Sequence, residues 1–359
     1  MTTLRTFGPD GRFLDSLTDW DDLELSWNLR GPEAGQVSMA VASVRAQKGA
    51  IRADNIGAYI VADASDVGVS EPWVGRIETV PGSSSSPQGT LGMRGPESWL
   101  DRRTVAAQKI TSGTSVAVLA DVIAGHPVDL RLSMGQVRYR GAVGQVDLAG
   151  QTVWALMGEL EDMRGCQVRL RGRMDATLAV EVHDPAGALD LSSAVTLSEG
   201  RNAEFDFEHD LVSATVDYVG VADSLSRPGG VLTSTASAPA VLLGQSRAYA
   251  AVTTMSTGLG MTGGGTAVIA PEIPNGPMLD AALDARLRRT MVLPTLAQCR
   301  VTDTALWSSL WPGVVVGVRA PSDPLGDFDR ALGLIEQITF RVTPPLECTV
   351  AITLWALEP

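Results

Sequence analysis

One seven-residue segment occurs twice in this chain, and it constrains the fold more than any other feature of the sequence. Residues 74–80 read VGRIETV, and residues 332–338 read LGLIEQI. Both follow the order apolar, Gly, any residue, Ile, Glu, polar, apolar. We expect each segment to be a β-strand, and the two strands to occupy equivalent places in a duplicated β-domain. The equivalent residues are Gly75, Ile77 and Glu78 in the first copy and Gly333, Ile335 and Glu336 in the second.

The two copies are separated by 332 − 74 = 258 residues, and apolar positions upstream recur at the same offset. We therefore expect two upstream strands to recur in register with the repeated segment. Two unrelated β-hairpins with loops of matched length would align as well. A different, helix-containing segment lies between the copies, however, and this favours duplication. The pairs at this offset are Met39 with Ala297, Val41 with Cys299, Ile56 with Val314, Ala58 with Val316, and Ile60 with Val318.

The first hundred residues alternate apolar and polar side chains almost throughout. In LELSWNL (23–29), Leu23, Leu25 and Trp27 point to one side, and the polar residues between them point to the other. GQVSMAV, NIGAYIVAD and PWVGRIETV predict further strands of the same kind.

The middle of the chain differs, because helical periodicity appears there. TSVAVLADVIAG (114–125) and QTVWALMGELEDMRG (151–165) each carry an apolar stripe of period 3.6. Thr152 is the expected N-cap of the second helix, and Gly165 is its expected C-cap. CQVRLRG and ATLAVEV then predict a hairpin.

These patterns predict a mainly β fold of the α+β class, with two similar β-barrel tube domains and an inserted, helix-containing α/β domain. The first tube domain would comprise residues 1–100, with a return strand at about 204–222. The inserted domain would comprise residues 101–203. The second tube domain would comprise residues 223–359 and contain a long neutral loop and one helix, at 275–289.

The charge of the chain limits its partners. It has 28 Lys and Arg against 41 Asp and Glu, a net charge of −13, so tight binding of nucleic acid is not expected. We expect neither a signal peptide nor a membrane-spanning helix, because no suitable apolar run exists. Cys166, Cys299 and Cys348 form no CxxC pair. The last two lie in apolar strand patterns, which predicts small core residues in a protein made in a reducing compartment.

No sequence pattern points to catalysis. His126, His183 and His209 fall in no motif, and HExxH, GxSxG and the glycine-rich nucleotide motifs are absent. We therefore expect no catalytic, cofactor or metal site. The acidic run at 204–210 has the carboxylates that calcium prefers, but their alternation along a strand favours a solvated polar face.

Three segments together resemble the hub proteins of tailed-phage tails. They are NIGAYIVADASDVGVSEPWVGRIETV (55–80), LWPGVVVGVRAPSDPLGDFDRALGLIEQITF (310–340) and the helix-led middle from SGTSVAVLADVIAG to CQVRLRG (112–172). This family includes the hubs of contractile-tail baseplates. It also includes the N-terminal parts of tail-associated lysins and the minor tail proteins of long non-contractile tails.

The resemblance implies a homotrimer in which two tube domains per chain make a ring of six similar β units. Such a ring fits a hexameric tail-tube or distal tail protein above it, and a central fibre or spike and the tape-measure C-terminus below it. In the repeated strands, glycine would allow close backbone approach, isoleucine would fill the barrel core, and glutamate would face the polar side. DNA would pass through an acidic lumen without specific binding. The protein would be part of the virion tail tip, after assembly in the host cytoplasm.

Two other functions stay open at this stage. A carbohydrate-binding tail-tip adhesin would use exposed aromatic residues, for which Trp307 and Trp311 are the candidates. A cell-wall hydrolase would need a pair of carboxylates that the sequence does not reveal. Because the last strand runs almost to Pro359, we expect cell-wall cutting and host recognition to reside on other proteins. The neutral stretch 231–270 is not explained by the resemblance, and a loop that reaches a neighbouring subunit is one interpretation.

Overall fold

The computed structural model describes most of the two ends of the chain and parts of its middle. The described residues are 2–29, 31–53, 56–80, 87–105, 109–110, 113–125, 131–137, 142–143, 146–147, 151–164, 167–183, 190–209, 217–223, 231–237, 251–252, 295–324, 328 and 330–356. The third expected helix (275–289), Cys166, Gly165 and most of the neutral stretch 231–270 lie outside them.

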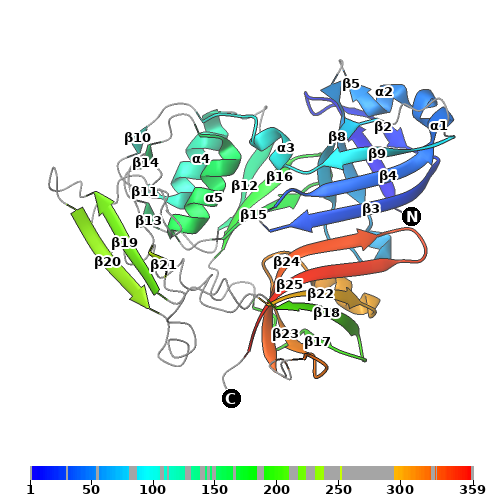
Figure 1. Cartoon of the computed structure of the whole chain (residues 1–359). Coiled ribbons are helices and arrows are strands. Elements are labelled where there is room, and N and C mark those ends of the chain that lie inside the picture. Colours follow the sequence, from blue (N-terminus) through cyan, green and yellow to red (C-terminus); the bar gives the residue numbers. More distant parts are fainter. Residues whose placement is uncertain are drawn as a thin grey trace.

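One large sheet connects the two ends of the chain (Figure 1). Its strands follow the order β18-β22-β25-β24-β3-β4-β9-β8-β7-β1-β2, and β23 pairs with β24 and β17 beside this path. The strands are β1 (Thr3–Phe7), β2 (Phe13–Leu17), β3 (Trp20–Asn28), β4 (Ala34–Ala40), β7 (Tyr59–Asp63), β8 (Trp73–Thr79), β9 (Gln88–Arg94), β17 (Thr196–Ser198), β18 (Ala203–His209), β22 (Thr295–Val301), β23 (Val315–Arg319), β24 (Ala331–Arg341) and β25 (Glu347–Ala356).

The mainly β character that the sequence predicts is therefore confirmed, but the arrangement differs from two separate barrels. The described strands of both ends belong to one continuous sheet, and no closed barrel is present among them. The expected return strand is also placed differently. β18 pairs with β22 of the C-terminal end, not with the N-terminal strands, and β19 (Asp217–Asp223) pairs with β20 (Val231–Ser237) and β21 (Ala251–Val252) in a separate small sheet.

The two ends of the sheet repeat the same order of five strands. In the first, β3, β4, β9, β8 and β7 are neighbours in that order, and every pair is antiparallel. In the second, β18, β22, β25, β24 and β23 are neighbours in that order, again with every pair antiparallel. We call these the N-terminal and C-terminal five-strand units. The repeated segment lies on β8 in one unit and on β24 in the other.

Both repeated strands contain a β-bulge at the same place. The pairing of β8 with β9 shifts between Ile77 and Thr79, so that Glu78 is skipped. The pairing of β24 with β25 shifts between Ile335 and Gln337, so that Glu336 is skipped. An extra residue in one strand bends it and increases its twist. The Ile-Glu pair of the repeat therefore marks a bend that both units share.

One cross-strand row through the repeated isoleucine shows which residues are equivalent. In the N-terminal unit the row is Leu25, Gly35, Met93, Ile77 and Ala58, and in the C-terminal unit it is Phe207, Ala297, Ile352, Ile335 and Val314. The last contact of each row is a backbone bond, from Ile77 N–H to Ala58 O and from Ile335 N–H to Val314 O, both 3.0 Å long.

This row corrects the alignment at a constant offset of 258. Ala297 is equivalent to Gly35, four residues before Met39, and Val314 is equivalent to Ala58, not to Ile56. Both slips are even numbers, so each shifted strand still points the same side chains to the core. Val41 is also misplaced, because it begins a helix rather than continuing a strand.

In each unit, short helices connect the second strand of the five-strand order to the fifth, that is, β4 to β7 and β22 to β23. In the N-terminal unit they are α1 (Val41–Ala46) and α2 (Lys48–Ile51), followed by the short strands β5 (Arg52–Ala53) and β6 (Ile56–Gly57). A 3₁₀ turn, η1 (Ser65–Val67), follows β7. In the C-terminal unit the connection is η3 (Thr304–Ser309), where the Asp303 carboxylate accepts the Ala305 N–H at 3.0 Å.

A single hydrophobic core runs under both units. It includes Trp73, Trp307 and Phe340, and the two cysteines Cys299 and Cys348, which are both 0% exposed. The expectation that these cysteines are small core residues is confirmed. Burial raises the pKa of the Cys299 thiol to about 12, so this thiol is unreactive at neutral pH.

The inserted segment packs on the side of β1, β7 and β8 (Figure 1). Its helices are α3 (Glu97–Leu100), α4 (Ser115–Gly125) and α5 (Val153–Arg164). Its strands are β10 (Lys109–Ile110), β11 (Gly113–Thr114), β12 (Leu132–Val137), β13 (Ala142–Val143), β14 (Val146–Asp147), β15 (Gln167–Gly172) and β16 (Leu178–His183). The predicted hairpin is confirmed, since β15 and β16 pair antiparallel. The N-cap is confirmed too, because the Thr152 hydroxyl accepts the Ala155 N–H at 3.1 Å.

Arg131 joins the inserted segment to the first hairpin of the sheet. Its side chain is 6% exposed and donates to the carbonyl oxygens of Ala176 (2.7 Å), Asp175 (2.9 Å) and Gly8 (3.5 Å). The guanidinium also lies over the Tyr59 ring, 4.7 Å from its centre. A planar group with several donors can satisfy all these partners at once, whereas an ammonium cannot.

Arg131→Met should therefore loosen the inserted segment from the sheet. We expect a loss of about 2–3 kcal/mol in the free energy of unfolding, because the buried carbonyls of Gly8 and Ala176 and the carbonyl of Asp175 lose a charged donor. Arg131→Lys should recover only part of this. Guanidinium denaturation followed by tryptophan fluorescence measures the effect, with exposed Arg201→Met as the control. Equal stability of the Arg131 and Arg201 variants would contradict this role.

Candidate assembly surface

From β18 to β9, the face of the large sheet that points away from the main core is a continuous polar surface. Cross-strand pairs place Glu204 beside Arg300, Arg300 beside Thr349, and Thr349 beside Thr339. The same face continues through Arg341 and Glu24 to Gln36. We call it the polar sheet face; its charged members are Asp22, Glu24, Arg94, Glu204, Asp206, Glu208, Arg300, Glu336, Arg341 and Glu347.

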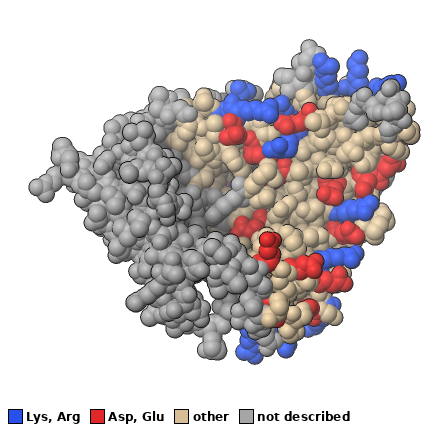
Figure 2. Space-filling model, viewed as in Figure 1, with Lys and Arg blue, Asp and Glu red and all other residues tan. Residues whose placement is uncertain are grey.

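The arginines of the polar sheet face are already engaged by acids. Arg300 lies 3.7 Å from Glu204 and 3.4 Å from Glu347, and Arg341 lies 3.1 Å from Asp22. Arg94 bonds Glu97 at 3.0 Å. Acidic and basic side chains are interspersed over the described surface visible in Figure 2. Among the described residues, no ion pair involves Glu24, Asp206 or Glu208, so the face keeps an acidic excess.

The acidic run at 204–210 is therefore part of this face. Glu204, Asp206 and Glu208 are exposed on β18, and the two phenylalanines between them are half-buried. The described part of the chain contains no cluster of three or more His, Cys, Asp and Glu side chains able to hold a metal ion.

The two glutamates of the repeat have different partners. Glu78 lies 3.4 Å from Arg102 of the inserted segment, and Glu336 accepts a hydrogen bond from the Thr353 hydroxyl at 3.2 Å. Both isoleucines are in the core, with exposed fractions of 2% for Ile77 and 0% for Ile335.

The two glycines of the repeat are buried and closely packed. A methyl group on Gly75 would overlap the Trp73 ring and approach the Arg94 carbonyl oxygen to 2.6 Å. On Gly333 it would meet the ends of side chains, with Ile352 at 2.5 Å and Leu354 and Val318 at 3.0 Å. The first position is the tighter, because a ring and a backbone atom move less readily than aliphatic ends.

Gly75→Ala should thus be the more damaging substitution. We expect a loss of about 3 kcal/mol in the free energy of unfolding for Gly75→Ala and about 1 kcal/mol for Gly333→Ala. Gly49→Ala is the matched control, since its methyl group would meet nothing within 4 Å. Urea denaturation midpoints rank the three variants, and the reverse order for Gly75 and Gly333 would refute the packing argument.

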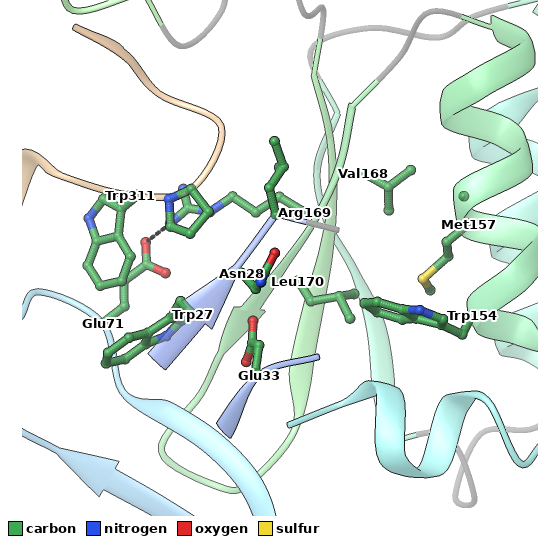
Figure 3. Close-up of a pocket in the computed structure, with 13 residues that line it drawn as sticks. Trp27, Asn28, Glu33, Glu71, Trp154, Met157, Val168, Arg169, Leu170 and Trp311 are labelled. Carbon is green, nitrogen blue, oxygen red and sulfur yellow. Dashed lines mark hydrogen bonds and ion pairs between the residues drawn. The ribbon is translucent and has the colours of Figure 1, made fainter. Parts of the chain in front are cut away.

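A pocket of about 270 Å³ lies where the inserted segment meets both units. Figure 3 shows Trp27 and Trp311 on one side, Trp154 and Met157 of α5 on the other, and Glu33 between them. Its described lining holds no histidine, cysteine, serine or lysine, and so offers no nucleophile with an adjacent base.

A charge network beside the pocket ties the inserted segment to the loop before β8. Glu71, 7% exposed, bonds Arg169 at 2.8 Å and Arg171 at 3.1 Å. Farther along, His183 Nε2 lies 3.2 Å from a Glu181 carboxylate oxygen. The hydrogen bond from His183 lowers the pKa of Glu181, whereas burial raises the pKa of Glu71 despite its two arginines. The Arg169 guanidinium also lies over the Trp311 ring, 5.4 Å from its centre.

Glu33 is the carboxyl group of the pocket with the strongest pKa shift. Burial raises its pKa well above the usual 4.5, and the negative charge of Glu97 adds to the rise. The Asn28 N–H and the charge of Arg169 oppose it. The folded protein therefore holds this proton more tightly than the unfolded chain does. Ionisation of Glu33 costs stability above its folded pKa, and this cost vanishes below pH 4.5.

Glu33→Gln should accordingly stabilise the protein at alkaline pH. We expect Tm to rise by about 3 °C at pH 8, and the difference from the unmodified chain to disappear at pH 4. Glu24→Gln, on the exposed polar sheet face, should show no such pH-dependent gain. Thermal unfolding followed by circular dichroism across this pH range provides the test. A gain in Tm that grows toward acid pH would contradict a raised pKa for Glu33.

The two tryptophans proposed for sugar binding do not form an exposed platform. Trp307 is 2% exposed and donates its indole N–H to the Val301 carbonyl, and Trp311 is 6% exposed and donates to the Ser308 carbonyl. Trp311 also packs edge-on against Trp27, with ring centres 5.5 Å apart. Their spacing of four residues places both rings against the core. The aromatic pair that suggested a carbohydrate-binding adhesin is therefore part of the packing of the fold.

Comparisons with known proteins place the fold. No protein-family model and no curated protein sequence matches the chain. A tail protein from Neisseria meningitidis matches with a TM-score of 0.65 at 15% identity, covering 98% of this chain and 95% of that one. The 43 kDa tail protein of prophage MuSo2 from Shewanella oneidensis matches with a TM-score of 0.65 at 12% identity, covering 98% and 97%.

A third solved structure extends the comparison to secretion systems. The E. coli c3393 protein, a type VI secretion component described as similar to the T4 tail proteins gp27 and gp5, matches with a TM-score of 0.51. It is 12% identical and the match covers 95% of this chain and 76% of that one. The chain therefore has the fold of phage tail proteins. Within the described residues, no helix is both long and apolar enough to span a bilayer.

Proposed function

We propose that this chain is a structural hub of a phage tail tip or baseplate. Three copies would form a ring with pseudo-sixfold symmetry. The ring would join the hexameric tail-tube or distal tail protein above it to a threefold fibre or spike and the tape-measure C-terminus below it. The tail-protein fold supports a role in the virion tail, with assembly in the host cytoplasm.

The observation that carries this proposal is the repeated five-strand order, with the same bulge in β8 and β24. Two equivalent units per chain give six units in a trimer. Six similar units can match the symmetry of a sixfold neighbour on one side of the ring. The three inserted segments present threefold symmetry to a different neighbour. On this proposal the repeat works through its backbone geometry, and its Gly, Ile and Glu residues are structural.

The polar sheet face would line the central channel in this assembly. Its acidic excess repels phosphate, and its arginines are occupied by neighbouring acids, so DNA would pass without binding. The role would be non-enzymatic, because neither the pocket nor the polar sheet face presents a catalytic group in a recognisable arrangement among the described residues.

A trimer in solution is the first test of the hub. We expect light scattering coupled to gel filtration to give three times the 37.8 kDa chain mass, and electron microscopy to show a ring with a central hole. A monomer at micromolar concentration with affinity for cell-wall sugars, or release of cell-wall fragments by the pure protein, would replace the hub with one of the two alternatives.

Charge reversal tests the channel. Glu24→Lys with Asp206→Lys should create salt-dependent binding of duplex DNA, because each reversal replaces a repulsive carboxylate with a phosphate partner. The unmodified protein should show none at 100 mM salt, as is expected at an acidic surface. Asp10→Lys with Asp121→Lys makes the same change in net charge away from the polar sheet face. Equal DNA binding by both double variants would show that net charge alone matters.

A further inference from the structure

We propose that the pocket between the inserted segment and the two units is a docking site for an arginine side chain of a neighbouring protein. The guanidinium of this arginine would bond the Glu33 carboxylate, and the tryptophans of the pocket would pack against its plane. The proposal concerns contact with a partner and does not depend on the trimer, because the residues that line the pocket all belong to one chain.

One side of the pocket already holds a guanidinium in this way. Arg169 lies over the Trp311 ring, 5.4 Å from its centre, and donates to the Glu71 carboxylate at 2.8 Å. An indole face and a carboxylate together thus stabilise one arginine. Trp311 and Glu71 are both largely buried, and a low dielectric strengthens their attraction for the cation.

The rest of the pocket offers the same two kinds of group. Figure 3 shows Glu33 between the Trp27 side of the pocket and Trp154 of α5. Among the described residues, no lysine or arginine forms an ion pair with Glu33, and no cation lies over the Trp154 ring. The groups that hold a guanidinium are therefore present twice around one pocket, and a described arginine fills only the first place.

The balance of charge around Glu33 favours a cation there. The two acids that act on Glu33 have bases of their own, since Glu71 bonds Arg169 at 2.8 Å and Glu97 bonds Arg94 at 3.0 Å. Burial and the charge of Glu97 raise the pKa of Glu33, so a proton neutralises a carboxyl group that lacks a base of its own. A cation from outside could take the place of that proton.

The lining favours an arginine side chain over a bare cation. Leu29, Leu170 and Met157 are apolar groups against which the methylenes of an arginine can pack. A planar guanidinium can lie flat on an indole and bond a carboxylate through two N–H groups, whereas an ammonium can do neither. Glu33 and Trp154 are half-buried rather than buried, so solvent reaches this part of the pocket.

The acids around the pocket also favour an arginine within a polypeptide over free arginine. Free arginine carries a carboxylate, which Glu33, Glu71 and Glu97 would repel at short range. An arginine inside a chain has an amide in that place. Because residues from both units and from the inserted segment line the pocket, a side chain bound there would contact all three parts of the molecule.

Calorimetric titration of the full chain with N-acetyl-arginine amide tests the site. We expect a Kd of about 1 mM, the order that one cation–π contact and one charged hydrogen-bonded pair can give. N-acetyl-citrulline amide has nearly the same shape without the charge and should not bind. Glu33→Gln should weaken binding at least about tenfold and Trp154→Leu about fivefold, whereas Glu24→Gln on the polar sheet face should leave the Kd unchanged.

The proton on Glu33 provides a readout that a structural role alone would not give. A guanidinium beside Glu33 favours its ionised form, so binding at pH 6 should release a proton. The charged groups that face Glu33 are Glu97 on α3, Glu71 before β8 and Arg169 on β15. The binding heat should therefore differ between phosphate and Bis-Tris buffers, whose heats of ionisation differ, and this difference should vanish in Glu33→Gln.

Four outcomes would overturn the proposal. They are no binding of the capped arginine at 20 times the expected Kd, equal binding of the citrulline compound, an equal loss of affinity in Glu24→Gln and Glu33→Gln, and a buffer difference that persists in Glu33→Gln. Equal or tighter binding of free arginine would make the pocket a small-molecule site, and tighter binding of N-acetyl-lysine amide would make it an ammonium site. Each result leaves the hub untouched, because the mass of the particle tests that separately.

Discussion

The structure depends on a β-bulge placed at the same point in two strands. A strand in a sheet with one buried face cannot shift its pairing by an odd number of residues, because a shift of one residue turns every core side chain toward solvent. At each bulge the chain skips one glutamate and keeps the preceding isoleucine in the core. The strands that precede the repeated segment differ in alignment by two or four residues between the two units, and the same faces still point to the core. The bulge lies at the same residue of the repeat in both units. The bend it makes sets the direction in which each strand meets its next neighbour.

Polar interactions decide where the inserted segment sits on this sheet. Apolar packing against β1, β7 and β8 provides contact but little directional preference. Arg131 and Glu71 supply direction, because each is largely buried and bonds a partner across the boundary. A charged group in such a place is costly without its partner, so small rotations of the inserted segment are penalised. The segment is thereby held at a fixed angle to the ring that we propose.

Sequence reasoning found the local features and missed those that depend on distant partners. The alternation in residues 23–29, the Thr152 cap and the β15–β16 hairpin depend on neighbouring residues, and the structure confirms them. The joining of β3 to β24 could not be foreseen, because an exposed strand edge has no signature of its partner. Trp307 and Trp311 left two interpretations open for a related reason: an aromatic pair at this spacing looks the same in the sequence whether it packs in the core or binds a sugar. Glu33 and Arg131 gave no signal, since burial of a charge depends on the whole fold.

Because β24 serves two neighbours along its length, neither five-strand unit has a complete edge without the other. Unfolding the C-terminal unit would strip β3 of its partner, and unfolding the N-terminal unit would leave half of β24 unpaired. The two units should therefore melt in one cooperative transition, although the segments that build them stand at opposite ends of the polypeptide. During synthesis the early unit must wait for the last strands to emerge, so its final stability arrives only when translation is nearly complete.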